Sequence, residues 1–363
     1  MLIILLAFSI LIRLVLLTHP NQPVFDELNY LPYIQQYLNG TPSFLPHPPL
    51  GVIIMGWGVE IFGDSPLGWR IVPVLMATIG VWLTYLLAFK ITRRENSALY
   101  AAAFLSFSPL WFTISRIAML DIIMTVLLLG AVYSYLNKGY WIGAVFAGLA
   151  LSTKWVALFP LALIYGLIWL DILRNRQFKV WDCLKPLCFP LIAVVIYFGI
   201  SACFFKDFNP AHLVEIQKTI LKFQAGIKGD ALNSSPAWSW YLIPQFIPCF
   251  NSGPGWFDKI AIMENPALLW WGIVSAGLVL ERIIRRKVTN LCLPWLLWLS
   301  LTLPFFFYQR PLYLYYLIPA LPFLYIMSGE MLEETAGQSF WSKAYLGFVI
   351  LSFFYLYPQL VMK

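Results

Sequence analysis

Two adjacent carboxylates and one histidine are the residues of this chain best suited to acid–base chemistry. Asp26 and Glu27 follow directly after the first hydrophobic segment, and His47 comes about twenty residues later, before Pro48 and Pro49. A carboxylate held near a reacting hydroxyl can act as a general base. Most of the remaining chain is apolar, so charged residues are scarce and their placement is informative. We therefore interpret Asp26 as the catalytic carboxylate of a membrane enzyme.

The composition is that of a polytopic membrane protein. The chain has 363 residues, of which 60% are hydrophobic, 17% aromatic and only 11% charged, whereas soluble domains carry about 25% charged residues. The formal charge of +7 does not indicate nucleic-acid binding, because the basic residues fall mostly in short loops between apolar segments. The five cysteines have no metal-like spacing. We expect an all-α integral membrane protein in which residues 1–363 form one helical unit.

The apolar segments predict about eleven transmembrane helices. Two polar stretches separate them, a first loop over 19–66 and a large loop over 206–262. We expect an interfacial helix at 50–63 in the first loop. In the large loop we expect an amphipathic helix, because apolar residues recur every three or four positions from Leu213 to Ile227. The predicted spans are about 2–18, 69–91, 97–113, 118–136, 140–152, 156–173, 186–205, 267–280, 291–308, 312–328 and 344–360.

The distribution of basic residues predicts a cytoplasmic N-terminus. In this orientation five short basic loops face the cytoplasm, and both polar loops face the opposite side. Ionisable residues far apart in the sequence then converge at one extracytoplasmic face: Asp26, Glu27, Arg116, Asp121, Lys154 and Arg310. The basic residues of the cytoplasmic loops are Lys90, Arg93, Arg94, Lys138, Arg174, Arg176, Lys179, Lys185, Arg282, Arg285, Arg286, Lys287 and Lys343.

This convergence of charges indicates a site for an anionic substrate. Arg and Lys suit phosphate oxygens, and a nearby carboxylate suits general-base action on a hydroxyl. We therefore predict transfer of a group from a lipid phosphate to an acceptor on the far side of the membrane. Two alternatives stay open: structural salt bridges among the same residues, or a transporter for an anionic or lipid-linked solute, which should show discontinuous helices or repeats. No GxGxxG, Walker, HExxH or GxSxG motif occurs in a suitable context, which disfavours a nucleotide-sugar donor bound by a soluble domain.

Several motifs occur in an order that resembles the protein O-mannosyltransferase family, the dolichyl-phosphate-mannose-protein mannosyltransferases, in its bacterial form. The related lipid A aminoarabinose transferases share the acidic first loop, but the stretch that begins at His47 is closer to the mannosyltransferases. Where many eukaryotic members have a histidine, this chain has Tyr315-Tyr316, and it has no room for their β-trefoil domain in the large loop. The matching motifs are Phe25-Asp26-Glu27, His47-Pro48-Pro49-Leu50-Gly51, Ser115-Arg116-Ile117-Ala118-Met119-Leu120-Asp121, Ser152-Thr153-Lys154-Trp155, Glu264-Asn265-Pro266 and Pro319-Ala320-Leu321-Pro322.

The resemblance implies a GT-C glycosyltransferase fold. It also implies a polyprenyl-phosphate-linked sugar donor, most simply mannose, and inverting transfer to an extracytoplasmic hydroxyl of a protein Ser or Thr, with a lipid or glycan acceptor as the alternative. In this family Asp26 corresponds to the general base and Glu27 to its close support.

The same resemblance gives roles to the other charged residues. Arg116 and Lys154 are expected to hold the donor phosphate, and Arg310 is either a further phosphate contact or an interfacial structural residue. Asp121 either orients Arg116 or serves as an acid at a helix N-terminus. His47 either shapes the acceptor side and assists the carboxylates, or is a loop histidine held by prolines. We expect no required cofactor; two carboxylates and a histidine make a divalent metal possible, but it is not favoured.

Overall fold

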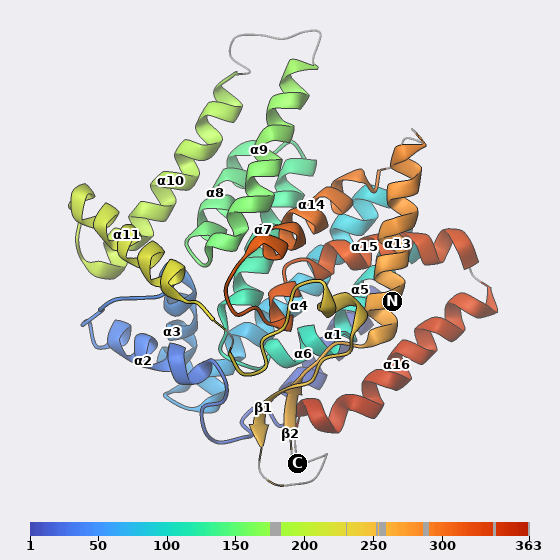
Figure 1. Cartoon of the computed structure of the whole chain (residues 1–363), viewed down its shortest axis with the longest axis horizontal. Helices are drawn as coiled ribbons and strands as arrows, with labels where there is room; N and C mark the ends of the chain where they lie inside the picture. Colours follow the sequence, from blue (N-terminus) through green and yellow to red (C-terminus); the bar gives the residue numbers. More distant parts are fainter. Residues whose placement is uncertain are drawn as a thin grey trace.

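The protein is a helical bundle with one two-stranded sheet at its edge (Figure 1). The computed structural model describes residues 1–174, 183–229, 231–251, 253, 259–285, 290–336 and 339–361. Arg176, Lys179, Arg286 and Lys287 of the expected cytoplasmic loops lie outside the described residues.

The helices and strands follow one another along the chain. The α-helices of the described part are α1 (Leu2–Leu14), α2 (Glu27–Leu38), α3 (Leu50–Phe62), α4 (Pro66–Thr92), α5 (Glu95–Ser106), α6 (Pro109–Ile114), α7 (Leu120–Leu136), α8 (Tyr140–Leu151), α9 (Leu158–Leu173), α10 (Leu184–Phe205), α11 (Pro210–Gly226), α12 (Ser239–Leu242), α13 (Pro266–Ile284), α14 (Cys292–Thr302), α15 (Leu321–Ala336) and α16 (Phe340–Val361). Three 3-10 helices, η1 (Trp155–Ala157), η4 (Leu303–Phe307) and η5 (Leu314–Leu317), and the strands β1 (Ile247–Asn251) and β2 (Lys259–Ile262) lie between them.

Four helices begin with the same local signal, a Ser or Asn directly followed by proline. The side chain accepts a hydrogen bond from a backbone N–H of the first turn, and proline occupies the first helical position, where no N–H is needed. Ser108 with Pro109 starts α6 in this way, so the expected single span at 97–113 is two helices, α5 and α6. The other capping residues are Ser65 of α4, Asn209 of α11 and Asn265 of α13.

Five of the described helices are long and apolar enough to cross a membrane. The expected count of about eleven spans is not confirmed, because several of the described apolar helices have only 10–17 residues. One physical reason is visible at 312–328, where the chain forms η5 and then starts α15 near Pro322. The long apolar helices are Pro66–Thr92, Trp155–Leu173, Leu184–Phe205, Pro266–Ile284 and Phe340–Val361.

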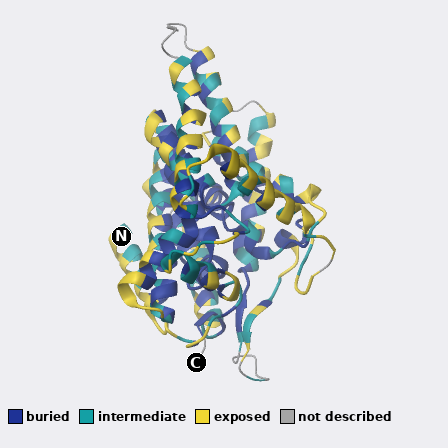
Figure 2. Ribbon diagram, turned by 90° about the vertical axis from the view of Figure 1, so that its left-hand side faces the viewer, coloured by how far each residue is buried: buried dark blue, intermediate teal, exposed yellow. Residues whose placement is uncertain are grey.

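Small residues bring the central helices into close contact. A Cβ atom on Gly329 of α15 would lie 2.5 Å from the Ser97 carbonyl oxygen of α5, so only glycine allows this approach. Helix α5 faces α15 and α4 with alanines, and α7, which packs on α4 and α8, is buried along most of its length. Figure 2 shows this buried interior, surrounded by helices with exposed outer faces. The ends of α7 and α8 are therefore fixed by a close-packed core.

The two polar loops lie together at one side of the bundle. Figure 1 places α2 and α3 of the first loop beside α11 of the large loop, and the Phe44 and Phe223 rings meet there at 5.3 Å. Helices α3 and α11 occupy the positions expected for the two interfacial helices. In α11 the predicted stripe buries Leu213 and Ile220. The antiparallel β1–β2 pair, which pairs Ile247 with Ile262, adds a sheet that the all-α prediction lacked.

Candidate active site

Five separate segments bring ionisable residues to one place beside these loops. Asp26 precedes α2, His47 precedes α3, Asp121 lies in the first turn of α7, Lys154 follows α8, and Arg310 lies between η4 and η5. The Lys154 ammonium donates a hydrogen bond to the Asp121 carboxylate at 2.8 Å, and both side chains are nearly buried. The charge of Lys154 also acts on Asp26 and on His47. These five residues are the ionic cluster of the site.

Burial and mutual charge set the protonation states of the cluster. Burial raises the pKa of Asp26, Lys154 opposes this shift, and Asp121 adds to it, so the pKa lies above the ordinary value. Burial disfavours the charged form of Lys154, but Asp121 and other neighbours outweigh it, so the pKa of Lys154 is raised. Burial, Lys154 and Arg310 keep the pKa of His47 well below its ordinary value. The cluster thus combines an ammonium ion, a neutral imidazole and a carboxylate that is a stronger base than an exposed one.

Tyrosine rings form a wall beside the cluster. The Lys154 ammonium lies 5.5 Å from the ring centre of Tyr316 and 6.0 Å from that of Tyr315. Tyr315 meets the Phe25 ring edge-on at 5.7 Å and stacks on Tyr313 at 5.5 Å. This wall desolvates one side of Lys154, and the rings favour its positive charge. The sequence drew attention to Tyr315-Tyr316 only as a difference from related proteins.

One glutamine on α11 connects the two polar loops at the site. Gln224 donates to the Pro46 carbonyl at 2.6 Å and accepts from Arg310 at 2.8 Å. Arg310 also donates to the Tyr316 hydroxyl at 3.4 Å. Through Gln224, the large loop therefore positions both Arg310 and the segment that carries His47.

Glu27 is more deeply buried than the neighbouring Asp26. Its side chain is fully buried and forms a two-pronged ion pair with Arg70 of α4, both N–O distances being 2.8 Å. The same carboxylate accepts hydrogen bonds from the backbone N–H groups of Val24 and Ala118, each at 3.0 Å. All of its acceptor positions face donors, so Glu27 supports the position of Asp26 and does not reach a substrate. Arg70, which also donates to the carbonyls of Leu17, Pro20 and Gln22, was missed by the sequence analysis.

Arg116 lies outside the ionic cluster. Its guanidinium donates to the carbonyls of Arg13 and Val15 at 2.6 Å and of Leu16 at 3.0 Å, and it lies 5.4 Å from the Phe112 ring centre. These carbonyls lie at or just beyond the end of α1, where helices leave unsatisfied acceptors with partial negative charge. The structure corrects the expectation that Asp121 orients Arg116, because Asp121 bonds Lys154. Its hydrogen bonds make Arg116 a clamp on the end of α1, and its expected role as a donor-phosphate ligand stays a prediction.

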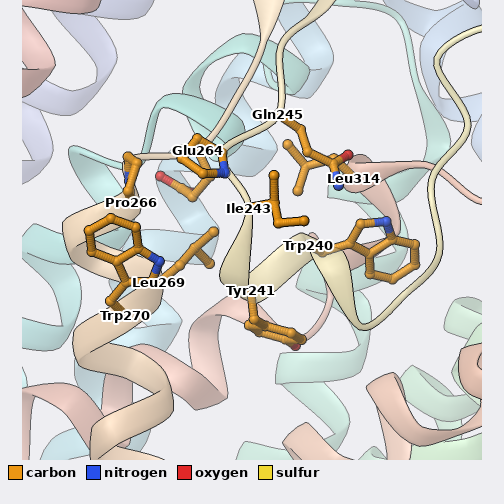
Figure 3. Close-up of a pocket in the computed structure, with 10 residues that line it drawn as sticks. Trp240, Tyr241, Ile243, Gln245, Glu264, Pro266, Leu269, Trp270 and Leu314 are labelled. Carbon is orange, nitrogen blue, oxygen red and sulfur yellow. The ribbon is translucent and has the colours of Figure 1, made fainter.

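Another buried acid, Glu264, lies at the junction of β2 and α13. The Ser108 hydroxyl and the Asn265 backbone N–H donate to it, and burial raises its pKa to about 8. It lines a cavity of about 10 Å³, with Trp240 and Trp270 nearby (Figure 3). A cavity of this size holds about one water molecule. Glu264 therefore belongs to the structural connection between α6, α13 and the large loop.

The ionic cluster has the parts needed for transfer from an anionic leaving group. A hydroxyl placed at Asp26 could give its proton to the carboxylate, while Lys154 and Arg310 met a developing negative charge. Within the ranges that the structure describes, no group of three or more His, Cys, Asp or Glu side chains could hold a metal ion.

The fold is that of known membrane glycosyltransferases. The chain aligns with the protein O-mannosyltransferase complex of Saccharomyces cerevisiae bound to its sugar donor, with a TM-score of 0.88 and 13% identity over 99% of this chain and 89% of that one. ArnT of Cupriavidus metallidurans bound to undecaprenyl phosphate aligns with a TM-score of 0.64 and 16% identity, over 96% and 63% of the two chains. The protein is thus an integral membrane protein with the GT-C fold, as the resemblance predicted.

Sequence comparisons narrow this class to one family. Two family models, both described as dolichyl-phosphate-mannose-protein mannosyltransferase, match residues 3–72 and 46–198. The polyprenol-phosphate-mannose–protein mannosyltransferase of Mycobacterium tuberculosis is 23% identical over 95% of this chain and 84% of the relative. The enzyme of the same name from Corynebacterium glutamicum is 21% identical over 88% of this chain and 79% of the relative. The chain belongs to the protein O-mannosyltransferase family.

Proposed function

We propose that this protein transfers a mannosyl group from a polyprenyl-phosphate donor to the hydroxyl of a protein Ser or Thr, with inversion at the anomeric carbon. The observation that carries the proposal is the Lys154–Asp121 pair beside the partly buried carboxylate of Asp26. The names of the relatives support the mannose donor and the protein acceptor. Neighbours solved with a sugar donor and with undecaprenyl phosphate support a polyprenyl-phosphate donor.

In the proposed reaction Asp26 is the general base. Its carboxylate takes the proton of the acceptor hydroxyl as that oxygen attacks the anomeric carbon, and the bond from this carbon to the phosphate oxygen breaks. The electron pair stays on the departing polyprenyl phosphate, where Lys154 and Arg310 stabilise the added negative charge. Asp121 positions Lys154, Glu27 positions Asp26, and the neutral His47 borders the acceptor side. The phosphate is a good leaving group, so the reaction needs no separate general acid.

We also propose that transfer requires no metal ion, because Lys154 and Arg310 supply positive charge for one phosphate group. The alternative, a divalent ion between the carboxylates and the phosphate, predicts loss of activity on chelation.

The site is proposed to face the extracytoplasmic side, with the N-terminus in the cytoplasm. The positions of the basic loops support this orientation. Single cysteines at Leu28, which is 64% exposed, and at Lys343 would test it in a chain whose five native cysteines are replaced. A membrane-impermeant maleimide applied from outside should label position 28 and not position 343. The reverse pattern would invert the assignment.

Transfer of radiolabelled mannose from polyprenyl-phosphate mannose to protein tests the activity directly. Asp26→Asn should abolish transfer while donor binding stays intact, and Asp207→Asn, the same change at a partly exposed acid of the large loop, should leave transfer unchanged. Full activity of the Asp26→Asn protein would reject Asp26 as the base.

The same assay separates the second candidate function. Label recovered in lipid or glycan instead of protein would indicate a transferase like the aminoarabinose enzymes, a possibility that the fold of ArnT keeps open. Absence of transfer with every lipid-phosphate donor, in a folded protein, would favour a transporter.

A further inference from the structure

A cleft of about 420 Å³ opens between two segments near the ionic cluster. One wall is 234–238 of the large loop and the other is 305–312, and the Ser235 backbone N–H donates to the Leu312 carbonyl at 2.8 Å between them. Its volume falls within the range of about 300–1,000 Å³ that is usual for ligand sites. We call it the 234–312 cleft.

The 234–312 cleft connects with the ionic cluster through one ring. Two of its lining residues contact Tyr316: Phe305 stacks on it at 5.3 Å, and Arg310 donates to its hydroxyl. The Lys154 ammonium lies 5.5 Å from the centre of the same ring. Tyr313 stacks on Tyr315, which meets the ring of Phe25, the residue before Asp26.

The lining residues match the chemistry of a polypeptide. Trp238 and Phe306, each about half exposed, offer rigid aromatic surfaces for side chains, while Ser234 and Gln309 offer hydroxyl and amide groups to a peptide backbone. A prenyl chain would need continuous apolar walls, which these polar groups and Arg310 interrupt. Arg310 is the only charged residue among the described residues that line the cleft.

We propose that the 234–312 cleft binds the acceptor polypeptide as an extended segment, with the target Ser or Thr directed past Arg310 toward Asp26. This inference rests on the proposed function, from which it takes a protein as acceptor. It assigns recognition of the acceptor to the large loop and to the 305–312 segment, and it leaves the donor phosphate at Lys154.

Photo-crosslinking tests the location of the acceptor. A benzoyl-phenylalanine residue would replace Trp238 in the full-length protein, and in a second protein it would replace Trp57 of α3, which has nearly the same exposure, 49% against 51%. The probe is a biotinylated peptide rich in Ser and Thr that has first been shown to accept mannose from the wild-type protein. We expect crosslinks at position 238 that unlabelled peptide suppresses, and none above background at position 57.

Kinetics of truncation variants give a second readout. Trp238→Ala and Phe306→Ala should each raise the KM for the peptide about tenfold, with the KM for the donor unchanged. Hydrolysis of the donor by water should also be unchanged, which shows that the variants fold and bind donor. Trp57→Ala should change none of these values.

The outcomes separate the two proposals. Transfer to the peptide without crosslinking at position 238 and without a change in peptide KM would overturn the cleft as acceptor site and leave the proposed function standing. Absence of transfer to any peptide or protein, with label passing to lipid or glycan, would overturn both.

Discussion

The buried Glu27–Arg70 pair offers the sharpest test of how the site is held together. Arg70→Met removes the charged partner but keeps an apolar side chain of similar length. The side chains of Glu27 and Arg70 are 0% and 1% exposed. Without Arg70, the Glu27 carboxylate retains only the N–H donors of Val24 and Ala118. Removing one member of a buried ion pair costs about 3–5 kcal/mol. Because two N–H donors remain, we expect the free energy of unfolding to fall by an amount near the lower end of this range, about 3 kcal/mol.

The free energy of unfolding would be measured by denaturant titration in mixed micelles, together with mannosyl transfer. Arg282→Met is the matched control, because Arg282 contacts Glu334 at the surface of the bundle, where an ion pair contributes about 0–1 kcal/mol. Glu27→Gln and the double variant complete a cycle whose coupling energy should exceed about 1 kcal/mol. If Arg70→Met destabilised the protein no more than Arg282→Met, the buried Glu27–Arg70 pair would be rejected as a support of the site.

Four further predictions follow from the site and the core. The raised pKa of Asp26 means that the inactive protonated base persists to higher pH, so kcat/KM should fall with decreasing pH at a point above the ordinary carboxyl range; an acid limb below pH 4 would contradict this. Lys154→Ala should raise the KM for the donor at least tenfold (about 1.4 kcal/mol or more), and Lys154→Arg should restore much of the donor affinity. Arg116→Ala should lower stability with little change in donor KM. Equal effects of Lys154→Ala and Arg116→Ala on donor KM would show that Arg116 is a phosphate ligand. Transfer should persist in excess EDTA, and loss that is restored by a divalent ion would show a required metal. Gly329→Val should separate α5 from α15, because its Cβ would meet the Ser97 carbonyl at 2.5 Å, and wild-type thermal stability of this variant would exclude the close contact.

Much of the architecture could be predicted from local patterns. The length of the apolar segments predicted a membrane protein, and the spacing of apolar residues from Leu213 predicted α11. The Ser-Pro and Asn-Pro signals mark four helix starts. The number of spans is not confirmed; at Ser108 a cap followed by proline divides one apolar run into two helices. A hydropathy pattern does not distinguish a buried short helix from one that crosses a membrane.

The site was predictable where topology alone decides placement. Asp26, Asp121 and Lys154 follow or begin elements that end on the same side, so the structure brings them together as expected. Which group each charged side chain bonds depends on side-chain geometry and could not be predicted from the sequence. Arg70 lies at the start of a predicted span, and nothing in its neighbourhood indicates that it reaches Glu27, 43 residues away in the sequence. The donation of Arg116 to backbone carbonyls could not be predicted either, because no residue pattern reveals such acceptors.

The neutral hydrogen-bond partners of Arg310 have a consequence for turnover. Lys154 is paired with the Asp121 carboxylate, whereas Arg310 donates to the neutral side chains of Gln224 and Tyr316. The charge of Arg310 is therefore solvated by neutral groups and stays available to a substrate, and such a cation favours ligands in proportion to their negative charge. The donor phosphodiester carries one such charge, and the departing phosphomonoester carries nearly two at neutral pH. Under the proposed reaction the spent lipid should bind more tightly than the fresh donor, which makes product release the slow step and polyprenyl phosphate a competitive inhibitor.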